Sequence, residues 1–276
     1  MKFFKLIKFD FKYGIAKRWY VYCIYIILSL IACIEFVMEL KAFDATSFTL
    51  GDCLFFLYSG ITEYIPKPNE PLTIPYLWLL LHLLVCYFNL HYMTDDLSGL
   101  GQYVICRCQK RSRWWLSKCI WNLVSVFIFF NLSVIVVLLI SAINNAELSI
   151  SISQTMQYIC NCNLLSNTSL TQGINLIHLI LVPMLVCAAI SMLQMLISLF
   201  VRPLIAYVLS IVIYFSSAYK LSALLLGNYA MLLRSDEILS NGVNAYVGII
   251  FSAIVIIMSI VGGLIYFKDY NILSRE

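Results

Sequence analysis

The stretch KCIWNLVSVFIFFNLSVIVVLLISA, residues 118–142, determines the class of fold that this chain can adopt. Its one charged side chain is Lys118, at the first position. A helix needs about 20 mostly apolar residues to cross a hydrocarbon layer of roughly 30 Å. The apolar run is continuous rather than alternating at every second residue, so we expect a membrane-spanning helix rather than a strand of a barrel.

Five further stretches of the same character lie at residues 19–38, 74–92, 174–201, 204–226 and 243–267. Arg202-Pro203 separates the fourth from the fifth of the six, and we expect a tight turn there because proline suits the first position of a helix. The chain is 62% hydrophobic and only 12% charged, whereas soluble domains carry roughly a quarter charged residues. We therefore expect an all-α integral membrane protein, with six transmembrane helices in a single domain over residues 1–276.

Lysine and arginine are distributed unevenly between the two sides of this predicted topology. With six spans, both termini share one side with the segments that join spans two to three and four to five. That side carries 14 of the 18 Lys and Arg residues. Because cations are retained on the cytoplasmic side of a membrane, we expect both termini to be cytoplasmic.

Residues 1–18 carry a second membrane signal ahead of the first span. On a helical wheel the cations Lys5, Lys8 and Lys12 fall beside an apolar arc. This pattern predicts an amphipathic helix in the headgroup layer, with its lysines toward anionic lipid; a solvated basic tail is the alternative. The arc consists of Phe3, Phe4, Ile7, Phe11 and Ile15.

Tryptophan marks the predicted cytoplasmic boundaries of two spans. Trp19 begins the first span, and Trp114 with Trp115 precedes the third. Because indole rings concentrate at membrane–water interfaces, we expect these three side chains to anchor the spans there.

Several chemistries are not represented in the sequence. No G-x-x-x-x-G-K-[ST] motif is present, so this chain is not expected to bind ATP through a P-loop, and no H-E-x-x-H zinc motif occurs. The spans are almost free of ionisable residues, which argues against a proton relay or an intramembrane protease. We expect no catalytic residue, no cofactor site, no metal site and no binding of nucleic acid.

Ten cysteines provide little functional information. Cys106 and Cys108 lie in a predicted cytoplasmic segment, where a reducing environment disfavours disulfides, and two such residues without a second pair are weak evidence for zinc. Cys53, Cys160 and Cys162 lie on the predicted outer side. A disulfide joining Cys53 to Cys160 or to Cys162 is a hypothesis that the sequence leaves open.

The segment TDDLSGLGQYVICRCQKRSR, residues 94–113, is the most informative part of the cytoplasmic side. It begins with Asp95-Asp96, continues through Gly99 and Gly101, and ends in a group of cations. Acids at the start and bases at the end of a short helix both suit the helix dipole. The alternative is an ordinary connecting loop whose cations only reflect the orientation of the spans.

At this segment the chain resembles the permease subunits of type-2 ATP-binding-cassette (ABC) transporters. Their cytoplasmic coupling helix begins with an acid, three residues and a glycine, and is followed by a Ser-Arg step and a Lys that opens the third span. Asp95-x-x-x-Gly99, Ser112-Arg113 and Lys118 stand in those places. This chain is also similar to the family in its six predicted spans, cytoplasmic termini, amphipathic N-terminal helix and short turn between spans four and five. Asp95 replaces the more usual Glu, and two cysteines between Gly101 and Ser112 are unusual.

The resemblance implies a partner-driven mechanism in a bacterial cytoplasmic membrane. Two permease subunits, identical or different, would pair, and each would rest its coupling helix on a separate ATPase subunit that holds the ATP and Mg²⁺. The chain itself would then not be an enzyme. The residues implied in the ATPase contact are Asp95, Asp96, Gly99, Arg111 and Arg113.

In this family the segment after the fifth span forms short re-entrant helices at the extracellular gate. The corresponding residues of this chain are Tyr229, Arg234, Asp236 and Glu237. A surface loop with an interfacial helix is the alternative for this segment.

Three functions remain to be compared. The first is export of an amphipathic substrate such as a peptide, an antibiotic or a lipid-like compound. The second is a non-transporting immunity or sensor protein that binds a ligand through its outer loops, and the third is a lipid-modifying enzyme, for which no convergent nucleophile or base is visible. A neighbouring gene for a P-loop ATPase would favour the first.

Overall fold

The computed structural model describes residues 3–43, 47–63, 74–90, 92–99, 111–160, 177–239 and 241–269. These residues are almost entirely helical and include no strand, only two isolated bridges. Five helices are long and apolar enough to cross a membrane: Trp19–Ala42, Tyr76–Leu97, Ser112–Ile143, His178–Ile197 and Ala245–Lys268. The chain is therefore a multi-pass, all-α membrane protein.

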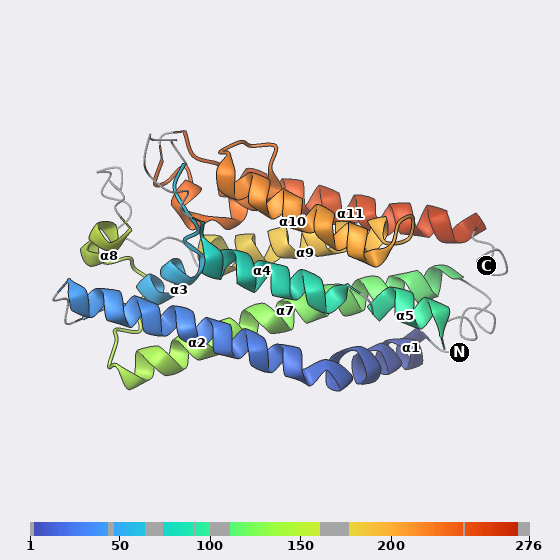
Figure 1. Ribbon diagram of the computed structural model, residues 1–276, viewed down its shortest axis with the longest axis horizontal. Helices are drawn as coiled ribbons and strands as arrows, with labels where there is room; N and C mark the ends of the chain where they lie inside the picture. Colours follow the sequence, from blue (N-terminus) through green and yellow to red (C-terminus); the bar gives the residue numbers. More distant parts are fainter. Residues whose placement is uncertain are drawn as a thin grey trace.

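The long helices lie side by side along the longest axis of the molecule (Figure 1). They are α2 (Trp19–Ala42), α4 (Tyr76–Asn89), α7 (Arg111–Ile143), α9 (Val182–Ile197), α10 (Pro203–Tyr219) and α11 (Ala245–Asp269). Helix α9 is the central element, because it packs against α4, α7, α10 and α11. Helix α11 instead exposes a row of large apolar side chains along its outer face, as a helix in contact with lipid does.

Helix α10 is shorter than expected. It begins at Pro203, after α9 has ended at Ile197, so the predicted turn at Arg202-Pro203 is confirmed. It ends at Tyr219 rather than at Leu226, however, and residues 226–230 form a separate 3₁₀ turn, η5 (Leu226–Ala230). Lys220 adopts an extended conformation directly after the helix, which stops the continuous apolar stretch from continuing as one helix.

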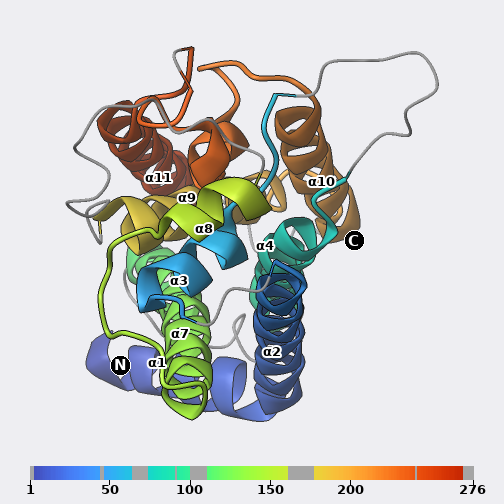
Figure 2. The same cartoon turned by 90° about the vertical axis from the view of Figure 1, so that its left-hand side faces the viewer.

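The N-terminal segment is helical and joins α2 through two irregular turns. These elements are α1 (Phe3–Asp10), the π-helical η1 (Phe11–Ile15) and the 3₁₀ turn η2 (Ala16–Arg18). Figure 2 shows α1 running crosswise to α2 and beneath α7, which it contacts. The buried stripe is Leu6, Asp10 and Gly14, spaced four residues apart, and it faces the protein. Helix α1 and the last turn of α11 lie at the same end of the bundle (Figure 1).

At the opposite end, the segment between α2 and α4 folds back into the bundle as α3 (Leu50–Tyr58). Nearly every residue of α3 is buried, although the sequence shows only a connecting segment here. A capping box starts the helix: the Thr49 side chain accepts a hydrogen bond from the Asp52 N–H, and the Asp52 carboxylate accepts one from the Thr49 N–H at 2.9 Å. The second Asp52 oxygen accepts the Ser153 N–H at 2.7 Å, which ties α3 to the segment before α8 (Gln154–Ile159).

Candidate functional site

The end of the bundle that carries α1 contains a fully buried cation. Lys118 lies on α7, and its ammonium group is 2.5 Å from Asp10 Oδ1 of α1 and 2.8 Å from Asp96 Oδ2. Asp96 belongs to α5 (Tyr92–Ser98), the short helix after α4. The Lys118 and Asp10 side chains are 0% exposed and that of Asp96 is 10% exposed. One lysine therefore joins three elements that are distant in sequence, and we call these three residues the Lys118 cluster.

Neighbouring side chains form further hydrogen bonds with the cluster. The Tyr92 hydroxyl donates to Asp10 Oδ1 at 2.9 Å, and the Ser117 hydroxyl donates to Asp10 Oδ2. Trp114 Nε1 donates to Asp96 Oδ2 at 2.9 Å. The Lys118 ammonium also lies 4.5 Å from the ring centre of Tyr92, within the range of a cation–π interaction. Buried charges are tolerated only when they are paired and hydrogen-bonded in this way.

Local sequence explains why α1 reaches the cluster. Gly14 presents no side chain where η1 crosses α7, and a Cβ there would lie 2.3 Å from Trp121 Nε1. This close approach, with Leu6 buried one turn before Asp10, turns the acid of α1 toward α7. Sequence reasoning missed Asp10, although its position in the Leu6–Asp10–Gly14 stripe and the presence of a lysine at the start of a span were both visible.

The predicted ATPase-contact residues divide into two groups. Asp95 is 65% exposed, and Arg18 pairs with it at 3.3 Å while also donating to the Phe88 carbonyl at 3.0 Å. Gly99 and Arg113 are exposed as well. Asp96 was expected to be an exposed contact residue, and this expectation is corrected. Lys118 and Trp114 both hold its carboxylate inside the protein. The side chain of Arg111 and the whole of 100–110, including Cys106 and Cys108, lie outside the described residues.

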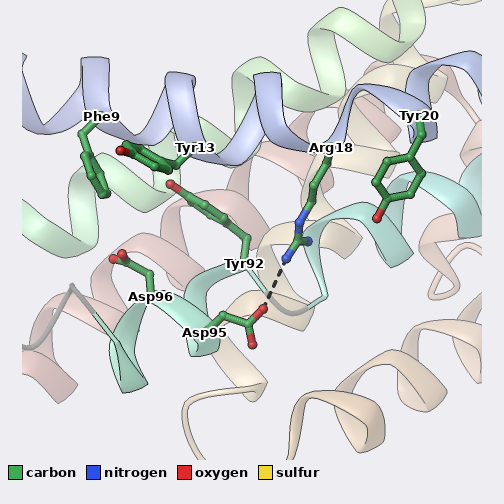
Figure 3. A pocket seen from close by; sticks show the side chains of 7 residues that line it. All are labelled: Phe9, Tyr13, Arg18, Tyr20, Tyr92, Asp95 and Asp96. Atoms are coloured by element: carbon green, nitrogen blue, oxygen red, sulfur yellow. Dashed lines mark hydrogen bonds and ion pairs between the residues drawn. The ribbon is translucent and has the colours of Figure 1, made fainter.

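A cleft of about 400 Å³ opens between the N-terminal segment and α5. Figure 3 shows aromatic rings along the N-terminal side of this cleft, with Tyr92, Asp95 and Asp96 on the α5 side and the Arg18–Asp95 ion pair between the two. The lining residues are Phe9, Tyr13, Arg18, Tyr20, Tyr92, Asp95 and Asp96. The cleft separates two elements that the Lys118 cluster holds together, so the exposed face of α5 is positioned relative to α1.

The predicted membrane anchors also divide. Lys5, Lys8 and Lys12 are exposed, and Trp19 is 65% exposed, as an interfacial role requires. Trp114 and Trp115 are fully buried, so their assignment as interface anchors is corrected. Trp115 Nε1 donates to the Ile260 carbonyl at 3.0 Å, and its ring lies directly over Gly263. Both indoles pack against Phe267 of α11, and Gly263 leaves space there for the Trp115 ring.

Arg234 is the central residue at the opposite end of the bundle. It lies in η6 (Leu232–Arg234), is fully buried, and donates to the Ile61 carbonyl at 2.9 Å and to the Ala218 carbonyl at 2.7 Å. It also donates to the Ser217 carbonyl and to the Asn228 amide oxygen. Burial lowers the pKa of Arg234 to about 10, which still leaves the guanidinium charged at neutral pH. Arg234 thus joins η5, the C-terminal end of α10 and the segment that contains Ile61.

The other three predicted gate residues are close to this unit. Tyr229 is 5% exposed, donates to the Ala223 carbonyl at 2.8 Å, and packs on Gly248 of α11. Asp236 accepts a hydrogen bond from Asn244 at 2.6 Å. Glu237 lies 2.9 Å from His178 Nδ1, at the start of η4 (Ile177–Leu181). All four predicted residues therefore lie in one packed segment, and each contacts a different neighbouring residue.

A polar network in the middle of the bundle is a further feature that sequence reasoning missed. Asn89 donates to Ser191 at 2.7 Å, and Ser191 donates to Asn122 at 2.9 Å, which joins α4, α9 and α7. Gln194 accepts from Ser210 at 2.9 Å, which adds α10. Such side chains hold helices together in lipid, where an unpaired polar group would be costly. Across the described residues, no group of three or more His, Cys, Asp or Glu side chains is placed to hold a metal ion.

Comparison with known proteins gives one match. The family described as "Protein of unknown function (DUF2705)" matches residues 63–273, which include α4, α5, α7 and every later helix. No curated protein and no solved structure matches the chain.

Proposed function

The chain belongs to the DUF2705 family, and we propose that it is the membrane-spanning permease subunit of an ATP-driven ABC transporter. In this proposal a separate ATPase chain binds and hydrolyses ATP with Mg²⁺, and a second permease subunit, identical or different, completes the pathway. The protein crosses the bacterial cytoplasmic membrane six times with both termini inside. It exports an amphipathic substrate such as a peptide, an antibiotic or a lipid-like compound.

The observation that carries this proposal is the junction of α5 with α1 and α7 through Lys118. A permease without its own ATP site must receive motion from a partner at its cytoplasmic end. Helix α5 presents an exposed acid there, Asp95, while its next residue is held by the first turns of α7. A push on α5 would then move α7 and α1 with it, because separating the charges of a buried ion pair is strongly unfavourable.

The assignment of residues follows their exposure. Asp95, Gly99 and Arg113 are proposed to contact the ATPase, whereas Asp96 transmits the contact inward to Lys118. Arg111 remains a proposed contact residue on the same segment. Tyr229, Arg234, Asp236 and Glu237 are proposed to form the part of the gate that closes the outer end, with Arg234 as its anchor.

Copurification tests the proposal directly. The full chain, carrying a C-terminal tag, is purified from its native host at low ionic strength, and the retained proteins are identified by mass spectrometry. We expect a P-loop ATPase in stoichiometric amount and ATP hydrolysis by the complex. The combined Asp95→Arg and Arg113→Glu substitutions should reduce ATPase retention by roughly tenfold, because each exposed charge contributes about 1 kcal/mol or less.

Glu147→Arg is the matched control, since it reverses an exposed acid after the far end of α7. It should leave ATPase retention unchanged. Recovery of the folded chain without any ATPase would overturn the proposal and favour a non-transporting sensor or immunity protein that binds its ligand through the outer segments.

A further inference from the structure

Two cysteines from different elements meet near the end of the bundle that carries α3. Cys33 lies on α2 and Cys53 on α3, and their sulfur atoms are 3.6 Å apart. Both residues are buried at 1% exposure, and both are free thiols. Two sulfurs at this distance are in van der Waals contact with nothing between them. Cys160, by contrast, is only partly buried, and Cys162 lies outside the described residues.

We propose that Cys33 and Cys53 form an oxidisable dithiol that a small-molecule disulfide converts into a covalent link between α2 and α3. The sulfurs need to approach by about 1.5 Å to reach a disulfide bond length of about 2.05 Å. Helix α3 has nine residues and packs against α2, so side-chain rotation and a small shift of this short helix supply that distance. This inference is independent of the proposed transport function.

The reaction balances as two thiol–disulfide exchanges. The thiolate of one cysteine attacks a sulfur of the reagent, which forms a mixed disulfide and releases one reagent thiol. The second cysteine then attacks the protein sulfur of that mixed disulfide, which forms the Cys33–Cys53 bond and releases the second thiol. The protein loses two electrons and two protons, and the reagent disulfide is reduced to two thiols.

The environment of the pair predicts slow oxidation. The contact with Cys33, followed by burial, raises the pKa of the Cys53 thiol well above its ordinary value. Because the thiolate is the reactive form, the pair should react more slowly than an exposed cysteine. Cys23, which is exposed on the same helix as Cys33, provides the internal comparison.

The alternatives for Cys53 make different predictions for the same experiment. A pairing with Cys160 would tie α3 to the residue directly after α8, whereas a pairing with Cys33 ties it to a long helix. Lys41 lies between Cys33 and Cys53 in the sequence, so tryptic cleavage there separates them into two peptides that only a disulfide can hold together.

The test uses the purified full chain in detergent with 2,2′-dipyridyl disulfide as the oxidant. Free thiols are alkylated, the protein is digested without reduction, and disulfide-linked peptides are identified by mass spectrometry. We expect a peptide pair that contains Cys33 and Cys53 and that disappears after treatment with dithiothreitol. Cys33→Ser and Cys53→Ser should each abolish this pair, whereas Cys23→Ser should leave it intact.

Folding is controlled by size-exclusion elution and by the thermal midpoint of each variant, and Cys33→Ala and Cys53→Ala replace any serine variant that elutes as aggregate. The inference is overturned if Cys53 of the folded protein is still a free thiol after prolonged oxidation, long after Cys23 has been consumed. It is also overturned if Cys53 is recovered in a disulfide with Cys160 or Cys162.

Discussion

Lys118 has two roles, and the sequence pattern reveals only one of them. In the sequence it counts as one more cytoplasmic cation before a span. In the folded chain its ammonium group is 0% exposed and contacts carboxylates from α1 and α5. A buried charge without its partner costs several kcal/mol, so this residue should dominate the stability of its end of the bundle.

Replacing Lys118 with methionine should therefore destabilise the protein strongly. Asp10 and Asp96 would remain buried without a cation, and removal of one partner from a buried ion pair costs about 3–5 kcal/mol. We expect the thermal midpoint in detergent, measured by fluorescence-detected size-exclusion chromatography, to fall by roughly 10 °C.

Arg113→Met is the control, because Arg113 is exposed on the same helix. It should change stability by about 0.5 kcal/mol or less. The triple variant Asp10→Asn, Lys118→Met, Asp96→Asn should recover part of the loss, since it removes all three charges together. Equal midpoints for Lys118→Met and Arg113→Met would show that the cluster contributes no stability.

Among the helices, two neighbouring glycines of α11, Gly262 and Gly263, have different surroundings, and only Gly263 faces α7. A Cβ on Gly263 would lie 2.0 Å from the ring of Trp115, which is fully buried and cannot move aside. A Cβ on Gly262 would meet only the flexible end of Leu196 at 3.2 Å. The sequence VGG offers no means of distinguishing these two positions.

Gly263→Ala should consequently destabilise the protein by about 1–3 kcal/mol, as overpacking of a tight core does. Gly262→Ala should be neutral or stabilising by up to about 1 kcal/mol, because alanine is the better helix former. The same thermal measurement distinguishes the two variants. Similar midpoints for both would mean that the Trp115 ring does not occupy the space above Gly263.

Element boundaries illustrate what local patterns can and cannot predict. The turn at Arg202-Pro203 was predictable because proline lacks the N–H group that an interior helical residue donates. This effect depends only on the proline itself, so the local sequence is enough to place the start of the helix. The end of α10 at Tyr219 was not predictable in this way. Residues 220–226 are apolar enough to extend a helix, but Arg234 takes up the carbonyls at the helix end and η5 packs beside α10.

At the scale of the whole molecule, α10 raises the question of how often the chain crosses the membrane. Five helices satisfy the length of a span, whereas α10 has 17 residues and is about 25 Å long. Arg202 and Lys220 flank it directly. Such cations reach toward the interfaces, and a short span is accommodated by local thinning of the bilayer. We expect α10 to cross the membrane as the fifth of six spans.

Thiol labelling tests this topology. On a cysteine-free background, Lys5→Cys and Lys268→Cys should both resist a membrane-impermeant maleimide in intact cells and react after lysis. Glu147→Cys should react in intact cells. If α10 does not cross the membrane, Lys5→Cys and Lys268→Cys will label from opposite sides.

Sequence alone determined the class of fold and most of the long helices. A bilayer demands long apolar runs, proline affects the backbone only near its own position, and the orientation of the spans follows from the summed cations on each side. It also indicated that acids and cations concentrate in residues 94–113 and in the N-terminal segment. Only the tertiary structure decided that Asp10, Lys118 and Asp96 meet, that Trp114 and Trp115 face the protein, and that α3 is buried beside Cys33. These contacts join segments from separate helices, so they depend on which faces the helices turn toward one another. Periodicity along a single helix does not carry that information.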